Sequence, residues 1–279
     1  MARTINEVSI FADGLDHPES IAIHPDQSVW AGGEAGQIYR ISANGKEISE
    51  IVNTGGFVLG IAFSPDLSWL AICDLKNKCV WKLELKSKTL TALRTNGNDQ
   101  ALITPNFPVF DKKGNLYVSD SGNFRQVNGR IWKFTPDGMG SVWHPGPFSF
   151  ANGMALNAAR DQLLVVCTWL PGVEQVEIDT DGNPGERKIL VHIPETCPDG
   201  IAIDQKGRVY ISCYAPNTIF SFDLNDGLTT VVHDWESHTI CNPTNIAFGG
   251  HNRQQLYIAN LGRWHISTME MEVPGLPLF

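Results

Sequence analysis

The sequence has no long hydrophobic stretch and no cluster of positive charge. Its 279 residues carry a formal net charge of -9, from 30 acidic against 21 basic residues, and no basic run is present. A nucleic-acid partner is therefore not expected. No segment approaches the roughly 18 continuous apolar residues of a membrane span, and the first residues, "MARTINEVSIFADG", lack the apolar core of a signal peptide. We expect a cytoplasmic protein without a membrane partner.

Paired cysteines and the common hydrolase motifs are also missing. The six cysteines (73, 79, 167, 197, 213 and 241) are scattered singly, without a Cys-x-x-Cys pair. They are interpreted as small buried hydrophobic residues, although Cys73 and Cys79 could face one another across a hairpin. The sequence contains no Gly-x-Ser-x-Gly, no His-Glu-x-x-His and no phosphate loop. Because the motifs of these other hydrolases are absent, metal-assisted hydrolysis is the hydrolytic mechanism that remains for this sequence.

Helical periodicity is absent, and a β-strand pattern repeats instead. Short runs rich in Val, Ile, Tyr, Trp and Phe alternate with clusters of Gly, Pro, Asn and Asp, which is typical of strands and turns. Six similar segments align on Ala22, Ala62, Val109, Ala155, Ala202 and Ala247, at intervals of 40 to 47 residues. Such a period is that of a four-stranded propeller blade.

The sequence therefore predicts an all-β fold, a six-bladed β-propeller of four-stranded blades, with residues 1–279 forming one domain. The last repeat shows too few strands for a blade, and a strand is left over before the first repeat, at residues 7–14. Because an open ring would expose two unpaired edges, we expect this N-terminal strand to join the last blade and close the ring.

One position of the repeat is rich in oxygen-bearing side chains. Three residues before each aligned Ala or Val, at the start of the innermost strand, the chain carries Glu19, Leu59, Asn106, Asn152, Asp199 and Thr244. In a propeller these side chains converge on the central channel. Two carboxylates that meet there without a counter-ion would repel each other and be costly to bury.

A divalent cation would remove this conflict. Glu19, Asn106, Asn152 and Asp199 form an all-oxygen set, which favours Ca²⁺, then Mg²⁺ or Mn²⁺, over Zn²⁺, while Leu59 and Thr244 complete the wall. The alternative for each residue taken singly is an ordinary turn or cap at the start of a strand. Their coincidence at one repeat position favours the metal site.

These residues also carry a resemblance to a known family. The segments "HPESIAI", "FANGMAL" and "CPDGIAIDQKGRVYISCY" and the tail "LGRWHISTMEMEVPGLPL" resemble the senescence-marker-protein/gluconolactonase family of regucalcin-like lactonases, related to the diisopropyl-fluorophosphatase type. The resemblance implies a divalent cation held by Glu19, Asn152 and Asp199, with Asn106 as a fourth ligand or a substrate contact. The ion is usually calcium, and Zn²⁺ or Mn²⁺ also serves some members.

The sequence departs from the sugar-lactonase pattern at the third repeat. There "TPNFPVF" places Phe107 where the family has an Asp proposed as general base, so a less polar substrate is expected. Asp199 is the first catalytic candidate, as ligand and water activator, and Asp120 at the channel mouth is the second, with a turn role as its alternative. Phe107, Trp169, Tyr214 and Trp264 are expected to contact a small-molecule substrate, with packing between blades as their alternative.

The function predicted is a metal-dependent lactonase or esterase acting on a small lactone or ester. One alternative is a calcium-binding or interaction propeller without catalysis, because a fold does not fix a function. Another is a carbon–nitrogen bond-forming enzyme of the strictosidine-synthase type.

Overall fold

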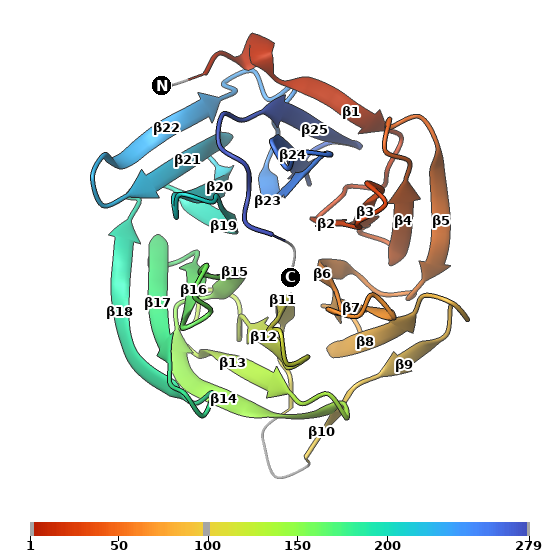
Figure 1. The fold of residues 1–279 in the computed structure, drawn as a ribbon, viewed down its shortest axis with the longest axis vertical. Coiled ribbons are helices and arrows are strands. Elements are labelled where there is room, and N and C mark those ends of the chain that lie inside the picture. Colours follow the sequence, from red (N-terminus) through yellow and green to blue (C-terminus); the bar gives the residue numbers. More distant parts are fainter. Residues whose placement is uncertain (1–2, 97–100, 278–279) are drawn as a thin grey trace.

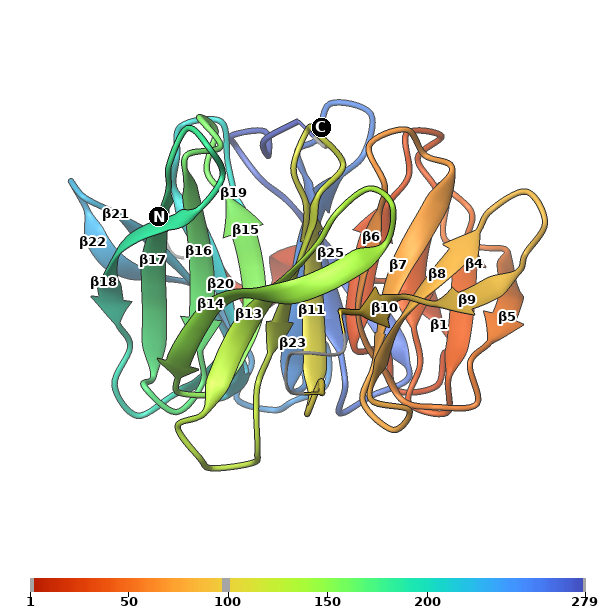
Figure 2. The same ribbon diagram turned by 90° about the horizontal axis from the view of Figure 1, so that it is seen from below.

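The chain folds as a six-bladed β-propeller, with six sheets arranged around a central axis (Figure 1). The structure is a computed structural model, and it describes residues 3–96 and 101–277. Figure 2 views the ring from its side, with the strands running between its two faces. The predicted fold class is confirmed, and helical structure in the described residues is limited to a 3₁₀ turn, Ile5–Glu7.

The first three blades follow the chain from its second strand onward, each starting with its innermost strand. Blade one contains β2 (Ser20–Ile23), β3 (Val29–Gly32), β4 (Gln37–Ile41) and β5 (Ile48–Asn53). Blade two contains β6 (Val58–Phe63), β7 (Trp69–Asp74), β8 (Cys79–Glu84) and β9 (Leu90–Ala92). Blade three contains β11 (Pro105–Phe110), β12 (Leu116–Asp120), β13 (Gly129–Phe134) and β14 (Met139–Phe148), and a short fifth strand, β10 (Arg94–Thr95), joins it parallel to β14.

The last three blades repeat this order. Blade four contains β15 (Ala151–Leu156), β16 (Gln162–Cys167), β17 (Gly172–Ile178) and β18 (Pro184–His192). Blade five contains β19 (Cys197–Ile203), β20 (Val209–Ala215), β21 (Thr218–Asp223) and β22 (Gly227–His233). Blade six contains β23 (Pro243–Gly249), β24 (Gln255–Asn260), β25 (His265–Glu270) and, from the other end of the chain, β1 (Ser9–Asp13).

The N-terminal strand closes the ring as predicted. β1 pairs antiparallel with β25, where Ser9 faces Thr268 and Asp13 faces His265. This pairing supplies the fourth strand of blade six, and it ties the first and last parts of the described chain into one sheet. The exposed edges of an open ring are thereby avoided.

The hydrophobic core lies between the blades. Six clusters of buried apolar side chains each join two neighbouring blades, so that every blade face is covered by the next one. The innermost strands carry small residues, as in "SIAI" of β2 and "ANGMAL" of β15, and these let adjacent inner strands approach one another around the axis. The position of the inner strands sets the geometry of the channel.

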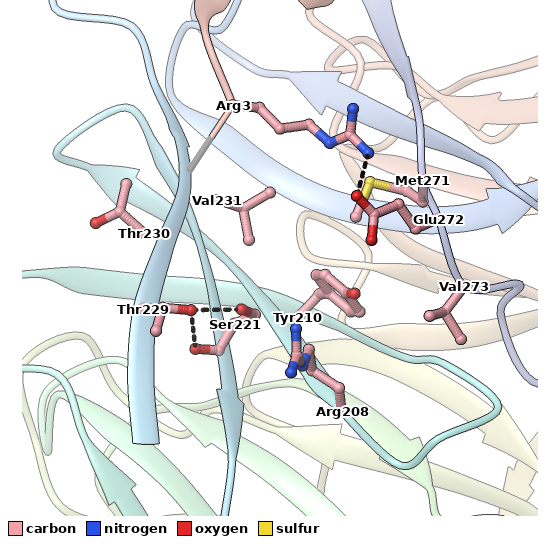
Figure 3. A pocket seen from close by; sticks show the side chains of 10 residues that line it. All are labelled: Arg3, Arg208, Tyr210, Ser221, Thr229, Thr230, Val231, Met271, Glu272 and Val273. Carbon is pink, nitrogen blue, oxygen red and sulfur yellow. Dashed lines mark hydrogen bonds and ion pairs between the residues drawn. The ribbon is translucent and has the colours of Figure 1, made fainter. Parts of the chain in front are cut away.

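The two terminal segments meet beside blade five. The Arg3 amide donates to the Val231 carbonyl at 2.6 Å, and its guanidinium lies 4.0 Å from a Glu272 carboxylate oxygen (Figure 3). These residues line a cavity of about 70 Å³ together with Arg208 and Tyr210. Because Arg208 is paired with Asp223 and Asp226, this small cavity is part of the closure and not a candidate site.

All six cysteines are free, and the burial expected of them is confirmed for four. Cys79 lies opposite Asp74 on the neighbouring strand, while Cys73 lies opposite Val80, so the two thiols do not form the alternative disulfide. In the described part of the chain, no helix is long and apolar enough to cross a membrane.

Candidate metal centre

The six residues of the oxygen-rich repeat position all lie at the start of innermost strands. Leu59, Asn106, Asn152, Asp199 and Thr244 belong to β6, β11, β15, β19 and β23, and Glu19 immediately precedes β2. We call the face of the ring at which these strands begin the site face, and the opposite face the far face. The mouth of the channel is its opening on the site face.

Glycines directly after three of these residues bring neighbouring blades together. A Cβ atom on Gly153 would lie 2.6 Å from the Asp199 carbonyl oxygen, and one on Gly200 would lie 2.6 Å from the Thr244 carbonyl oxygen. Gly60 stands in the same relation to Asn106, at 2.5 Å. Any side chain there would push the inner strands apart, so glycine at this position allows neighbouring inner strands to approach closely.

Each asparagine is held through a hydroxyl group in the same way. The amide nitrogen donates to the hydroxyl, and the hydroxyl donates to a backbone carbonyl of the next blade; we call this pair of hydrogen bonds a hydroxyl relay. The Asn106 amide nitrogen donates to Ser121 Oγ at 3.0 Å, and Ser121 Oγ donates to the Ala151 carbonyl at 2.6 Å. In the next blade, the Asn152 amide nitrogen donates to Thr168 Oγ1 at 3.2 Å, and Thr168 Oγ1 donates to the Pro198 carbonyl at 2.8 Å. Each relay fixes the plane of its amide.

The amide oxygens are left without partners by this arrangement. Among the described residues, neither the Asn106 nor the Asn152 side-chain oxygen accepts a hydrogen bond. Both asparagines are 5% exposed, and their amide groups are oriented by the hydroxyl groups that they contact. Oriented amide oxygens of this kind suit a hard cation.

The two carboxylates influence each other electrostatically. Burial, followed by the charge of Asp199, raises the pKa of Glu19 well above its usual value, and a hydrogen bond from Thr244 opposes the shift. Burial also raises the pKa of Asp199 well above its usual value, opposed by a hydrogen bond from Asn152. Glu19 is 8% exposed, and its Oε2 atom is buried without any hydrogen-bond partner.

The chemistry of these residues is compatible with a divalent cation between them. An orphaned carboxylate oxygen beside a second acid is unfavourable unless a positive charge joins them. No group of three or more His, Cys, Asp or Glu side chains in residues 3–96 and 101–277 is placed to hold a metal ion. The candidate centre falls outside such groups because two of its four residues are asparagines, whose amide oxygens are ligands that hard cations accept.

Asp120, the second catalytic candidate, is fully buried and has its own partners. Its carboxylate accepts hydrogen bonds from the amides of Ile103, Thr104 and Gly122 at 3.0, 2.7 and 3.2 Å, and from Trp132 Nε1 at 3.4 Å. A carboxylate with four donors anchors the surrounding loops. The structure favours the turn role of Asp120 over a catalytic one.

Aromatic side chains surround the mouth. Tyr214 is 40% exposed and Trp264 is 53% exposed, and Trp264 packs at 5.6 Å between ring centroids against His17, two residues before Glu19. Burial, and then the charges of Glu19 and Asp199, raise the pKa of Tyr214, which therefore lies within electrostatic range of both carboxylates. These positions fit the predicted substrate contacts.

Trp169 belongs to an aromatic group that the sequence analysis did not recognise as a unit. Its ring lies 5.5 Å from Phe124 and 5.7 Å from Phe150, and the Arg125 guanidinium lies 5.7 Å above it. Phe124 and Arg125 come from the long loop between β12 and β13, and Phe124 is 67% exposed. A phenylalanine followed by arginine within this polar loop was the signal available in the sequence.

Phe107 does not lie at the mouth of the channel. It packs against the core between blades three and four, and it lines a cavity that extends toward the far face. The reason is the alternation of the strand, since Asn106 and Phe107 are consecutive and point to different sides of β11. Phe107 therefore fits its packing alternative better than a contact at the mouth.

Fold and site together define a six-bladed propeller with a ring of oxygen donors where its innermost strands begin. A family model described as "SMP-30/Gluconolactonase/LRE-like region" matches residues 83–261, which is more than half of the chain. The chain belongs to this family. The matched region contains Asn106, Asn152 and Asp199, whereas Glu19 lies before it.

Solved structures share the fold at low sequence identity. A gluconolactonase from Xanthomonas campestris superimposes with a TM-score of 0.79 at 17% identity, covering 96% of this chain and 89% of that one. A regucalcin from Agrobacterium tumefaciens, described as a calcium-binding protein, superimposes with a TM-score of 0.77 at 15% identity, covering 95% of both chains.

A curated relative lies closer in sequence. The protein strictosidine synthase-like 4 of Arabidopsis thaliana is 28% identical over 224 residues, which cover 71% of this chain. The match spans 56% of that relative, so the two proteins correspond over only part of its length.

Proposed function

We propose that this protein is a metal-dependent carboxylic ester hydrolase that opens a lactone or a related small ester. Its single domain, residues 1–279, would hold one divalent cation, most readily Ca²⁺, through Glu19, Asn106, Asn152 and Asp199. The main support is that the charge of Asp199 acts on the buried Glu19 carboxylate, and that two hydroxyl-anchored amides occupy the same repeat position in other blades. Membership of a family that includes gluconolactonases supports the same direction.

The chemistry requires few further groups. A divalent cation polarises an ester carbonyl and makes a bound water more acidic. The two asparagine oxygens and Glu19 bind and orient, and the Asp199 carboxylate, half-buried at the channel, is our proposed proton acceptor from the attacking water. Asp120 fixes the blade-three loop through its hydrogen bonds to backbone amides.

The mouth points to a substrate less polar than a sugar lactone. Tyr214, Trp264 and the group of Phe124, Phe150 and Trp169 offer apolar surface, and Arg125 adds one cation over two of these rings. An aliphatic or aromatic lactone fits such a surface better than a polyhydroxylated one.

Hydrolysis of a panel of aliphatic, aromatic and sugar lactones, followed with and without chelator, tests the proposal. We expect turnover of at least one apolar lactone, its loss on chelation, and its recovery when Ca²⁺ is restored. Turnover that is indifferent to chelator would reject the role of the cation. No turnover across the panel with calcium demonstrably bound would instead support a non-catalytic calcium-binding propeller.

A second candidate comes from the curated relative. Its name, strictosidine synthase-like, suggests a carbon–nitrogen bond-forming enzyme, and the 28% identity is the observation that favours this reading. Product formation from an amine and an aldehyde, insensitive to chelator, would support it over ester hydrolysis.

A further inference from the structure

The central channel contains a second, chemically different space toward the far face. It is an apolar cavity of about 220 Å³ lined by inner strands of blades one, two, three, five and six. Its wall includes Ile21, Phe63, Phe110, Ile201, Ala247 and Phe248. All of these lie downstream of the oxygen-rich repeat position in their strands, so the cavity is on the opposite side of that position from the mouth. We call it the far cavity.

Two arginines are the charged residues among those that line the far cavity. Arg160 comes from the turn between β15 and β16, and Arg253 from the equivalent turn between β23 and β24. The equivalent turn position holds Gly114 in blade three and Gly207 in blade five, with φ values of 83° and 82°. In blades one and two it holds Gln27 and Leu67, at 71° and 58°.

The backbone at these turns does not favour arginine. Arg160 and Arg253 have φ values of 63° and 58°, in the left-handed region that suits glycine and strains other residues. Blades four and six are the two that carry a cationic side chain at this turn position, and both side chains reach the same cavity. This coincidence indicates a role for the two guanidinium groups inside the far cavity.

Both guanidinium groups are weakly held by the described residues, and Asp111 lies within electrostatic range of Arg160. Among the described residues, Arg160 and Arg253 form no ion pair, and their hydrogen bonds to the carbonyls of Phe110 and Gly275 are long, both at 3.4 Å. Burial lowers the pKa of both, to about 10 for Arg253, with Asp111 opposing the shift for Arg160. Partly buried cations without an ion pair are unfavourable, and an anionic ligand would relieve this.

We propose that the far cavity binds a small amphipathic carboxylate, such as a medium-chain fatty acid, with its carboxylate at Arg160 and Arg253 and its chain along the apolar wall. The planar guanidinium group is suited to bidentate recognition of a carboxylate. A free molecule fits better than an anionic membrane surface, because the site is recessed in the channel and the protein carries a net charge of -9. This site is separate from the proposed ester hydrolysis.

Calorimetric titration of the full chain with octanoate, and with 1-octanol as the uncharged match, tests this proposal. We expect octanoate to bind one per chain, and Arg160→Gln and Arg253→Gln each to weaken it by about tenfold or more. The affinity for 1-octanol should change by less than about threefold in these variants, because the apolar wall is intact. Ala247→Leu, which fills the cavity, should weaken both ligands.

Matched controls separate this site from the metal centre. Arg94→Gln, at an exposed arginine of β10, should leave octanoate binding unchanged, and so should Asp199→Asn. Thermal melts show whether each variant is folded. The proposal is overturned if folded wild-type protein does not bind octanoate, if both arginine variants bind it as tightly as wild type, or if Asp199→Asn abolishes binding. None of these outcomes depends on whether the protein hydrolyses lactones.

Discussion

The two ends of the central channel are built on the same six short strands and have opposite character. At the site face, the strands begin with carboxylates and amides, and the pKa values of Glu19 and Asp199 are raised by burial. At the far face, the wall is apolar, and the pKa values of Arg160 and Arg253 are lowered by burial. Among the described residues, the charged groups named at each end form no ion pair with a group of the other sign.

Two other buried acids of the ring, in contrast, have hydrogen-bond partners within the protein. Asp74 and Asp120 end the second strands of blades two and three, and each accepts hydrogen bonds from backbone amides and from one tryptophan, Trp81 or Trp132. These carboxylates are satisfied and hold loops. The Oε2 atom of Glu19, which has no hydrogen-bond partner, contrasts with these satisfied carboxylates.

Removing one carboxylate from the site face should have the largest effect. Asp199→Asn keeps the shape of the side chain but removes one of two negative charges, so we expect calcium affinity to fall by at least about 100-fold, with lactone turnover falling in parallel. Without calcium, the same variant should be more stable than wild type, because it removes a buried charge repelled by Glu19. Calorimetry and denaturant unfolding measure the two effects.

Unchanged calcium affinity in this variant would contradict the prediction. If Asp199→Asn binds calcium like wild type, the cation is not at this position. Asp66→Asn changes an acid in a surface turn, whose carboxylate is held by Ser64 and Ser68, and it serves as the matched control. Its calcium affinity should equal that of wild type.

Weakening the hydroxyl relays should have an intermediate effect. Thr168→Val keeps the volume of the side chain but leaves the Asn152 amide without its anchor, so calcium affinity should fall by about 10- to 100-fold. Thr168→Ser retains the hydroxyl, so its calcium affinity should be close to that of wild type. Ser121→Ala tests the same relay in blade three. Equal calcium affinity in Thr168→Val and Thr168→Ser would show that the amides are oriented by packing alone.

The sequence predicted the ring because its period and its polar positions are local features. The spacing of the repeats and the oxygen-rich position, including Glu19 and Asp199, could be aligned without knowing any long-range contact. The relays through Ser121 and Thr168 could not, since they depend on how the second strand of one blade meets the first strand of the next. For Phe107 the sequence left a substrate contact and packing between blades as alternatives, and the contact with the core between blades three and four depends on how the two blades meet.

The pH dependence of calcium binding should give a smaller effect with a definite sign. Because the pKa values of Glu19 and Asp199 are raised in the metal-free fold, this fold binds more protons than the unfolded chain at mildly acidic pH. Its stability therefore declines as the pH rises from the usual carboxyl range, near 4, through the raised values. Calcium replaces those protons, so its stabilising effect should grow over the same interval.

Thermal melts at pH 5 and pH 7.5, with and without calcium, measure this difference. At calcium concentrations well above its dissociation constant, we expect the melting temperature to rise by roughly 5 °C at pH 7.5 and by less at pH 5. Asp199→Asn should flatten the pH dependence of the metal-free protein, because one of the two titrating groups is gone. Arg253→Gln, at the other end of the channel, should leave the calcium effect at both pH values unchanged. An equal calcium effect at the two pH values would mean that the buried carboxylates are not the groups that the cation neutralises.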